Sequence, residues 1–385
     1  MSKGEGRTMS RLLCCVVAVA GLAMVLAGCG TREVVWTTTI DMGIDEVAAA
    51  LCADRENLYV VGTQTNPKSG RSLWLLQVLD RRGRLLRRQA FVEGAVNIAA
   101  DAALRPDGGV FICGRSVVRD TAICLVLDWR PNGNVAFKRG LVMGEQSWAN
   151  GVCALPGNRV AVCGAGVHGQ ASDMFVAVLD SSGRTEWMRN YDFSGVEQAH
   201  RICADAAGNL VVLGQTKLEE ACPDLLVMKL GAKGETLWTR RYDSGGMDVP
   251  GDIALDRFGN VIAVGTAKSG DSARCVILEY DADGGAVRKV AFGEQAQAEG
   301  NAVTVTEEGD VFVAGAQLEQ KGRTVLAYHY LPNATTVWER HVRLGSDAAA
   351  AALVEGGDIY VAATVQNATK DIAVVRLFRP AAERP

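Results

Sequence analysis

A short apolar segment that ends in glycine recurs about every 50 residues along most of this chain of 385 residues. The repeated residues are Gly62, Gly114, Gly164, Gly214, Gly265 and Gly315, with Ala363 in the seventh place. Successive members lie 48 to 52 residues apart, a regularity that unrelated loops would not keep. One unit of this size cannot bury both of its faces, so the period predicts units that stack or close into a ring.

Each repeat predicts four strands. The copy around Gly214 reads NLVVLGQT, then DLLVMKL, then ETLWTRRY, and GDIALD begins the next copy. These runs are rich in Val, Ile and Leu and are bounded by Gly, Asp or Asn, which are strand and turn signals. Glycines recur between the predicted third and fourth strands, where a positive φ is needed: Gly83, Gly133, Gly183, Gly234 and Gly284.

The two ends of the repeat array complement one another. The seventh repeat stops near Phe378 without a fourth strand, whereas residues 34–40 read VVWTTTI, the fourth-strand pattern. Trp36 lies 26 residues before Gly62, close to the 27 residues that separate Trp187 from Gly214. We therefore predict an all-β, seven-bladed β-propeller with four-stranded blades, whose last blade is closed by the N-terminal strand. An open β solenoid is the alternative.

Residues 1–28 have the features of a lipoprotein signal peptide. Arg11 precedes an apolar run, and the run ends in Leu26-Ala27-Gly28-Cys29, which resembles the bacterial lipobox. Cys29 would then be the lipidation site and residues 29–33 a short tether. An acyl anchor predicts an extracytoplasmic, membrane-anchored lipoprotein. Because Gly30 rather than Asp follows Cys29, the outer membrane is favoured if the cell is diderm. A retained transmembrane anchor is the alternative.

The remainder is predicted to be one domain, a propeller over residues 34–380 with a tail at 381–385. Its motifs GNVxxVGT, DxxVxxLDxxG, the following Trp and A-x-D together resemble the bacterial β-propeller repeat family called SBBP. The resemblance spans residues 34–378, implies a propeller fold and brings no catalytic motif. A weaker similarity, in the Gly-x-x-x-Trp turn, is to the quinoprotein-like repeats of outer-membrane assembly lipoproteins, which are shorter.

Composition and local motifs exclude several classes of protein. A net charge of −4 and a pI near 5.7 give no basic bias toward nucleic acid. The four histidines lack zinc-site spacing, and the calcium-like start at Asp281 lacks a Glu at its twelfth place, where Phe292 stands. We therefore predict no metal and no cofactor. Most cysteines are expected to be buried free thiols, with a Cys113–Cys124 disulfide as the alternative.

A candidate binding face follows from the predicted topology. Loops between the second and third strands should share a face with the loops that lead into each first strand, near the mouth of the central channel. His200 is the most suggestive residue there, although an ordinary polar turn residue explains it too, because Asn150, Gly251 and Asn301 occupy its place in other repeats. The full set of candidate residues is His200, Glu197, Asp248, Asn97 and Ser147.

Repeats without a matched acid, base, nucleophile or metal set favour a noncatalytic binding or scaffold module for an envelope protein or glycan. We expect it to be a monomeric propeller that reaches the membrane through its N-terminal lipid. The alternative is an envelope enzyme whose site lies at the channel mouth, with glycans as the candidate substrate, because carboxylates from different blades can converge without a local motif. The repeat-locked tryptophans, such as Trp36 and Trp238, are predicted to pack between blades rather than to stack on a ligand.

Overall fold

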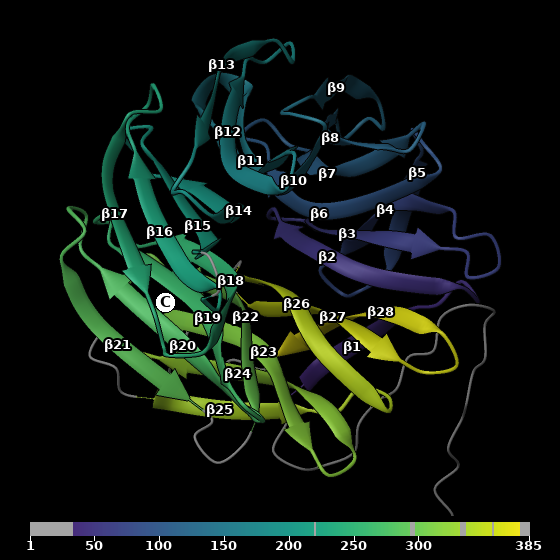
Figure 1. Ribbon diagram of the computed structural model, residues 1–385. Helices are drawn as coiled ribbons and strands as arrows, with labels where there is room; N and C mark the ends of the chain where they lie inside the picture. Colours follow the sequence, from purple (N-terminus) through teal and green to yellow (C-terminus); the bar gives the residue numbers. More distant parts are fainter. Residues whose placement is uncertain (1–33, 219–220, 293–296, 332–335, 356–357, 378–385) are drawn as a thin grey trace, which may run out of the picture.

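The computed structural model describes residues 34–218, 221–292, 297–331, 336–355 and 358–377. These residues form 28 strands and one 3-10 turn arranged around a ring, so the predicted all-β propeller fold is confirmed (Figure 1). The signal peptide and Cys29 lie outside the described residues.

Five sheets are separate four-stranded blades. Two follow each other near the N-terminus: β2 (Asp45–Ala53), β3 (Asn57–Thr65), β4 (Ser72–Asp80) and β5 (Leu85–Phe91), then β6 (Val96–Leu104), β7 (Val110–Val118), β8 (Thr121–Trp129) and β9 (Val135–Leu141). Two more lie later in the chain: β18 (Met247–Leu255), β19 (Val261–Ser269), β20 (Ser272–Tyr280) and β21 (Ala286–Phe292), then β22 (Ala298–Val305), β23 (Val311–Glu319), β24 (Gly322–Tyr330) and β25 (Thr336–Val342). The fifth combines β26 (Asp347–Glu355), β27 (Ile359–Gln366) and β28 (Lys370–Leu377) with β1 (Val34–Ile40).

The remaining strands form one eight-stranded sheet. Its members are β10 (Gln146–Leu155), β11 (Arg159–His168), β12 (Ala171–Leu179), β13 (Thr185–Tyr191), β14 (Val196–Ala204), β15 (Leu210–Lys217), β16 (Asp224–Leu230) and β17 (Thr236–Tyr242), with the 3-10 turn η1 (Pro156–Asn158) between the first two. Our prediction of seven four-stranded blades is therefore wrong, because only five sheets have that form. The physical reason is a single parallel pair, Ser172 with Val196, which joins β12 to β14 through the main chain.

The N-terminal strand lies in the same sheet as the end of the chain. β1 pairs antiparallel with β28, with Trp36 opposite Arg376 and Ile40 opposite Ile372. Figure 1 shows the purple β1 beside the yellow β28. The first and last strands thus share main-chain hydrogen bonds, and the N-terminal segment covers the edge that β28 would otherwise expose.

The hydrophobic core lies between neighbouring sheets. One cluster, for example, combines Tyr59 and Trp74 of one blade with Ile112 and Trp129 of the next. The strand tryptophans pack across these junctions as predicted. Trp238 donates its Nε1–H to the carbonyl of Ala282 at 3.1 Å. Its ring fills the space beside Gly284, where φ is +83°, so this turn accepts no side chain.

The thiols of the described residues are all free. Cys113 and Cys124 are both buried and do not form the alternative disulfide.

The strands that begin each unit contact one another in a closed circuit around the axis, from β2 through β6, β10, β14, β18, β22 and β26 and back to β2 (Figure 1). We call these the inner strands. The turns between second and third strands lie beside the segments that lead into the next inner strand: the amide of Ser72 donates to the carbonyl of Ala95 at 3.2 Å, and Gln297 Nε2 donates to the carbonyl of Asp271 at 2.7 Å. We call the face that holds these turns and segments the hairpin face.

Candidate functional site

Four of the candidate residues occupy the same place, near the start of an inner strand. Asn97, Ser147, Glu197 and Asp248 are at most 1% exposed. We had expected them to approach the channel mouth, but their side chains are buried at the junctions between successive units. Sequence reasoning placed them correctly along the strand and could not show which neighbouring groups enclose them.

The Asn97 side chain is saturated with neutral hydrogen bonds. Its Oδ1 accepts from the amides of Glu93 and Gly94 and from Ser116 Oγ, at 2.9–3.2 Å. Its Nδ2 donates to the carbonyls of Ser72 and Gly94, at 2.7 and 2.9 Å. This side chain ties two blades together and has no capacity left for a ligand.

Ser147 also links neighbouring units, through fewer hydrogen bonds than Asn97. Its hydroxyl donates to the carbonyl of Leu141 at 2.9 Å and accepts from the amide of Cys124 at 3.3 Å. Both partners belong to the junction between β8, β9 and β10, so Ser147 is a neutral link between units.

Glu197 and Asp248 differ because each belongs to a cluster of three carboxylates. One cluster contains Asp173, Asp192 and Glu197, and the other contains Asp224, Asp243 and Asp248; in each, ligand-capable oxygens lie within 4.8 Å of one another. Burial raises the pKa of Glu197 and of Asp248 above their ordinary values; hydrogen bonds to each carboxylate oppose this rise, and the charges of nearby acids add to it. One oxygen of Glu197 and one of Asp248 has no hydrogen-bond partner.

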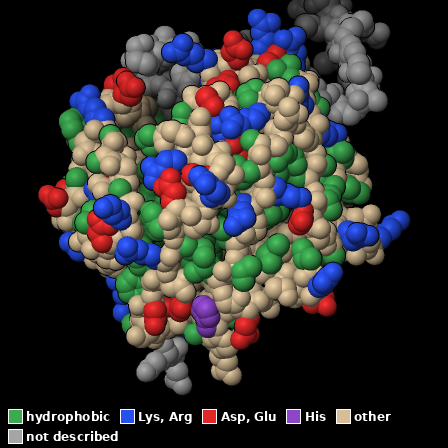
Figure 2. Space-filling model, turned by 90° about the horizontal axis from the view of Figure 1, so that it is seen from above, with side chains coloured by type: hydrophobic (Ala, Val, Ile, Leu, Met, Phe, Trp, Pro, Cys, Tyr) green, Lys and Arg blue, Asp and Glu red, His purple; other side chains and the backbone are tan. Residues whose placement is uncertain are grey.

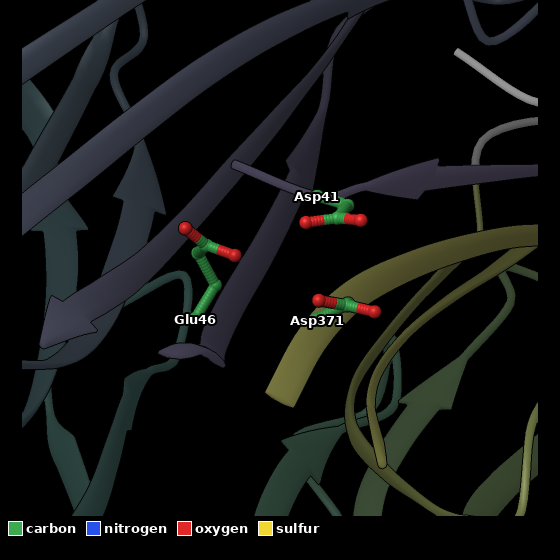
Figure 3. Close-up of side chains that lie close together, drawn as sticks. All are labelled: Asp41, Glu46 and Asp371. Atoms are coloured by element: carbon green, nitrogen blue, oxygen red, sulfur yellow. The ribbon is translucent and has the colours of Figure 1, made fainter. Parts of the chain in front are cut away.

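A third cluster of the same kind was missed from the sequence. It contains Asp41, Glu46 and Asp371, and Figure 3 shows their carboxylates gathered between the segment after β1, the strand β2 and the strand β28. The signal was available, because Asp41, Asp192 and Asp243 follow the fourth strand at one place in the repeat, each five residues before a second acid. Among the described residues, the groups able to hold a metal ion contain only carboxylates.

His200 lies within the inner strand β14 rather than in the turns of the hairpin face. Burial, helped by the charge of Arg201, lowers the pKa of His200 to about 4, so the imidazole is neutral at pH 7. Its Nε2 is buried without a hydrogen-bond partner. In the equivalent places Asn150 and Asn301 donate to the carbonyls of Ala199 and Ala350, at 2.8 and 2.9 Å. His200 thus occupies the place of these asparagines, but its Nε2 lacks the hydrogen bond to the next inner strand that they make.

The inner strands carry a further charged group that the sequence did not indicate. Arg201 has its Nε 3.7 Å from an oxygen of Asp252, and its Nη1 donates to the carbonyl of Asn150 at 3.0 Å. Burial raises the pKa of Asp101 to about 6, although the charge of Arg201 opposes the rise. Asp101 and Asp252 each accept a hydrogen bond from the next inner strand, at Val152 and Val303. These carboxylates therefore brace neighbouring strands.

The enzyme hypothesis required a close pair of carboxylates or a partnered His200 near the axis. In the described part of the chain, the acids near His200 are engaged by Arg201 and by main-chain amides, and no three-carboxylate cluster includes Asp101 or Asp252. The neutral imidazole has no orienting carboxylate at Nε2. Besides burial, the charge of Asp252 raises the pKa of Asp101, so these two carboxylates influence each other, and the charge of Arg201 opposes that rise. Through their main-chain partners, both carboxylates brace neighbouring inner strands.

The hairpin face has a polar hollow of about 250 Å³ between the β19–β20 turn and the strands β22 to β24. Its charged groups come from neighbouring sheets: Glu299 lies 3.8 Å from Lys268 and 3.6 Å from Arg323. Asp271, Gln297 and Leu318 complete its rim. Figure 2 shows that acidic, basic and apolar side chains are likewise interspersed along the side of the molecule, without a large area of one sign.

No helix among the described residues is long and apolar enough to cross a membrane.

Comparison with known proteins supports the fold alone. No family model matches the sequence, and no curated protein matches it either. Among solved structures, the chain is similar to an ulvan lyase described as a new family of polysaccharide lyase. The TM-score is 0.60 and the identity 11%, and the match covers 90% of this chain and 100% of that chain. It is also similar to Drosophila Plexin A in complex with Semaphorin 1b, with a TM-score of 0.54 and 11% identity over 90% of this chain and 87% of that chain.

A third similar structure is the β-propeller domain of the Trilobed protease from Pyrococcus furiosus, with a TM-score of 0.52 and 9% identity over 86% of this chain and 93% of that chain. That domain is described as having an open velcro topology, whereas β1 pairs with β28 here. All three identities lie far below the level at which a likeness extends to activity. The chain thus has a β-propeller fold, similar to those of proteins with different activities.

Proposed function

We propose that this chain is an SBBP-type lipoprotein, anchored by lipid on Cys29, whose propeller is a noncatalytic binding or scaffold module for a protein or glycan of the cell envelope. The observation that carries the binding role is the polar hollow on the hairpin face. Lys268, Glu299 and Arg323 come from neighbouring sheets and hold charges of both signs at its surface. Such a surface can hydrogen-bond hydroxyl, amide and carboxylate groups.

The burial of the other candidates supports this assignment. Asn97 and Ser147 are committed to neutral hydrogen bonds within the fold, and His200 is neutral and lacks a carboxylate at Nε2. A partner would therefore meet the loops of the hairpin face rather than a set of reactive groups in the channel. Solved structures of similar fold include both a polysaccharide lyase and Plexin A in complex with Semaphorin 1b, so the fold is compatible with binding.

The anchor is supported by the sequence around Cys29 and by the short distance along the chain to the ring. Only residues 30–33 separate Cys29 from β1. A tether of this length, at most about 14 Å, would hold the β1–β28 side of the propeller close to the membrane surface. The proposed location is extracytoplasmic, at the outer membrane in a diderm cell.

Photo-crosslinking in cells tests the binding role. A photoreactive residue at Leu318, on the rim of the hollow, should give discrete crosslinked products with an envelope component, and Glu299→Ala should remove them. The matched control is Phe258, which is also an exposed apolar residue (69% against 45% for Leu318) but lies in a turn on the opposite face. Equal products from both positions, or none from Leu318, would contradict the proposal.

Metabolic labelling with an alkyne fatty acid tests the anchor separately. The wild-type chain should be labelled and should sediment with membranes, whereas Cys29→Ser should lose both properties. Cys222→Ser is the control, because Cys222 is an exposed free thiol within the propeller. Labelling that survives in Cys29→Ser would rule out lipidation at this residue.

A further inference from the structure

Three carboxylates meet where the first and last strands of the ring are joined. Asp41 follows β1, Glu46 lies in β2 and Asp371 lies in β28, and oxygens of the three lie within 4.8 Å of one another. Glu46 is 0% exposed and Asp371 is 2% exposed, whereas Asp41 is open to solvent. The cluster therefore has a buried floor and an accessible side.

The hydrogen bonds of the fold leave this cluster incompletely satisfied. Glu46 Oε1 accepts from Gln64 Nε2 at 2.8 Å, and Asp371 accepts from Asn367 and Thr369 at 2.7 and 2.9 Å. Glu46 Oε2 is buried with no partner, and Figure 3 shows this carboxylate turned toward the other two. No lysine or arginine of the described residues forms an ion pair with the cluster. A buried carboxylate beside two others requires a compensating positive charge or a proton.

The electrostatics agree with this view. Burial has the largest effect on the pKa of Glu46 and raises it. Hydrogen bonding to Gln64 and to the backbone of Met42 lowers this pKa, and the charges of Asp371 and Asp41 raise it further, so that it lies above its ordinary value. Without a cation, the charges of Asp371 and Asp41 disfavour the ionised form of Glu46.

The same three acids recur together at other junctions. Asp371 lies two residues before the residue of β28 that pairs with Ala363. Asp173 and Asp224 lie two residues before the partners of Gly164 and Gly214, so they occupy the same place in two other units. Each of them is accompanied by acids at the other two places.

Two other units have no acid at any of the three places. One has Leu73, Val92 and Asn97 there, and the next has Ile123, Val142 and Ser147. Where the strand place holds Thr324, the other two places hold Arg343 and Ala348, so all three acids are missing together there as well.

This pattern indicates a shared ligand rather than three separate turn residues. A side chain that only capped a turn would vary independently of the other two, whereas ligands of one ion are needed together. The two other clusters already have a basic neighbour: Arg241 forms an ion pair with Asp224, and His168 Nε2 lies 3.9 Å from Asp173. The cluster of Asp41, Glu46 and Asp371 has none, so it retains the largest uncompensated charge.

The donor chemistry selects the class of ion. All three side chains offer carboxylate oxygen, and no His or Cys belongs to the group. Oxygen-only sites suit hard divalent cations, and irregular geometry with an open side suits Ca²⁺ better than Mg²⁺, which demands a small octahedral site. Water would complete the coordination on the side of Asp41.

We propose that a divalent cation, Ca²⁺ by its chemistry, binds between Asp41, Glu46 and Asp371 and ties the N-terminal segment, β2 and β28 together at the closure of the ring. This proposal is independent of the partner of the hairpin face. It adds a ligand site that strengthens the junction on which the ring depends. The expected affinity is that of extracellular calcium modules, with a Kd of about 10⁻⁴–10⁻³ M.

Calorimetric titration of the purified full chain, freed of metal by chelation, tests the proposal with CaCl₂ and MgCl₂ as probes. The wild type should bind Ca²⁺ in the stated range and Mg²⁺ more weakly, and Ca²⁺ should raise its Tm by at least about 2 °C. Asp41→Asn and Asp371→Asn should weaken this site at least about tenfold. Asp41→Asn should fold normally, because an amide oxygen can still accept the Gly43 amide at the place of Oδ1.

The matched control is Glu56→Gln, which removes an exposed acid from the turn after β2 and should bind Ca²⁺ as the wild type does. Any Ca²⁺ binding at the two other acidic clusters would survive in Asp41→Asn and Asp371→Asn. The measured quantity is therefore the Ca²⁺ binding that these two variants lose relative to the wild type. Two results would overturn the proposal. One is no heat and no rise in Tm for the wild type up to about 10 mM Ca²⁺, ten times the weakest expected Kd. The other is Ca²⁺ binding by Asp41→Asn and Asp371→Asn that equals the wild type.

Discussion

Asn97 and Glu46 occupy the same place in the repeat, the second residue of an inner strand where two units meet. Their polar side chains are satisfied in different ways. Asn97 is surrounded by neutral donors and acceptors that use both ends of its amide. Glu46 faces two other acids and keeps one buried oxygen without a partner. The comparison shows that the backbone of the junction does not require charge. Charge at Glu46 therefore points to something beyond folding, and the bound cation is our explanation.

The largest predicted effect is on the neutral junction. Asn97→Ala would leave the amides of Glu93 and Gly94, Ser116 Oγ and the carbonyl of Ser72 without their partner. We expect a loss of about 3 kcal/mol in the free energy of unfolding. Urea denaturation measures it. A loss below about 1 kcal/mol would mean that the hydrogen bonds of Asn97 do not hold the two blades together.

The second prediction concerns pH and the place shared by His200, Asn150 and Asn301. The pKa of His200 falls from 6.5 to about 4 in the native state, so the unfolded chain binds more protons between these values. Stability should therefore fall as the pH decreases from 6.5 to 4, by about 2 kcal/mol from this group.

His200→Asn should remove that part of the acid sensitivity, because Asn can donate to the next inner strand as Asn150 does. The measurement is the difference in urea midpoint between pH 7 and pH 4.5, with His341→Asn as the control at an exposed histidine. An unchanged pH dependence in His200→Asn would show that this imidazole is protonated normally in the native state.

The third and smallest effect sharpens the contrast at Glu46. In chelator, Glu46→Gln should be as stable as the wild type or more stable by about 1 kcal/mol, because it removes a buried charge beside two acids. The raised pKa of Glu46 means that the native state keeps a proton that the unfolded chain releases. Wild-type stability in chelator should therefore fall as the pH rises above 4.5, and the variant should lose less.

Saturating Ca²⁺ should reverse the order of the two proteins at pH 7, since only the wild type keeps all three ligands. Thermal unfolding with and without Ca²⁺ measures this crossing. A variant that remains the more stable protein in Ca²⁺ would speak against the cation.

The sequence predicted what repetition determines. The period and the turn glycines predicted the strands, and the position of Trp36 predicted the strand that pairs with β28, which the Trp36–Arg376 pairing confirms. The tryptophans pack between units as expected, because a large aromatic at a fixed place in a repeat meets the same neighbour each time.

Contacts between units could not be predicted in the same way. The Ser172–Val196 pair merges two units into one sheet, and it depends on main-chain geometry that the side-chain pattern does not encode. The burial of Glu197 and Asp248 depends on residues more than 20 positions away in the chain, such as Asp224 for Asp248. The same limit applies to single acids: Asp281 Oδ1 accepts the amides of Asp283 and Gly285 within its own turn, whereas Asp243 joins an acidic cluster with residues of two strands.

Hydrogen exchange of the wild-type chain with and without Ca²⁺ tests the central contrast most directly, because it examines both junctions in one sample without any substitution. We predict that Ca²⁺ slows exchange in residues 41–46 and 367–371, which surround the acidic cluster, and leaves residues 93–97 at the neutral junction unchanged. Equal slowing at both junctions, or no slowing at residues 41–46 and 367–371, would contradict the account.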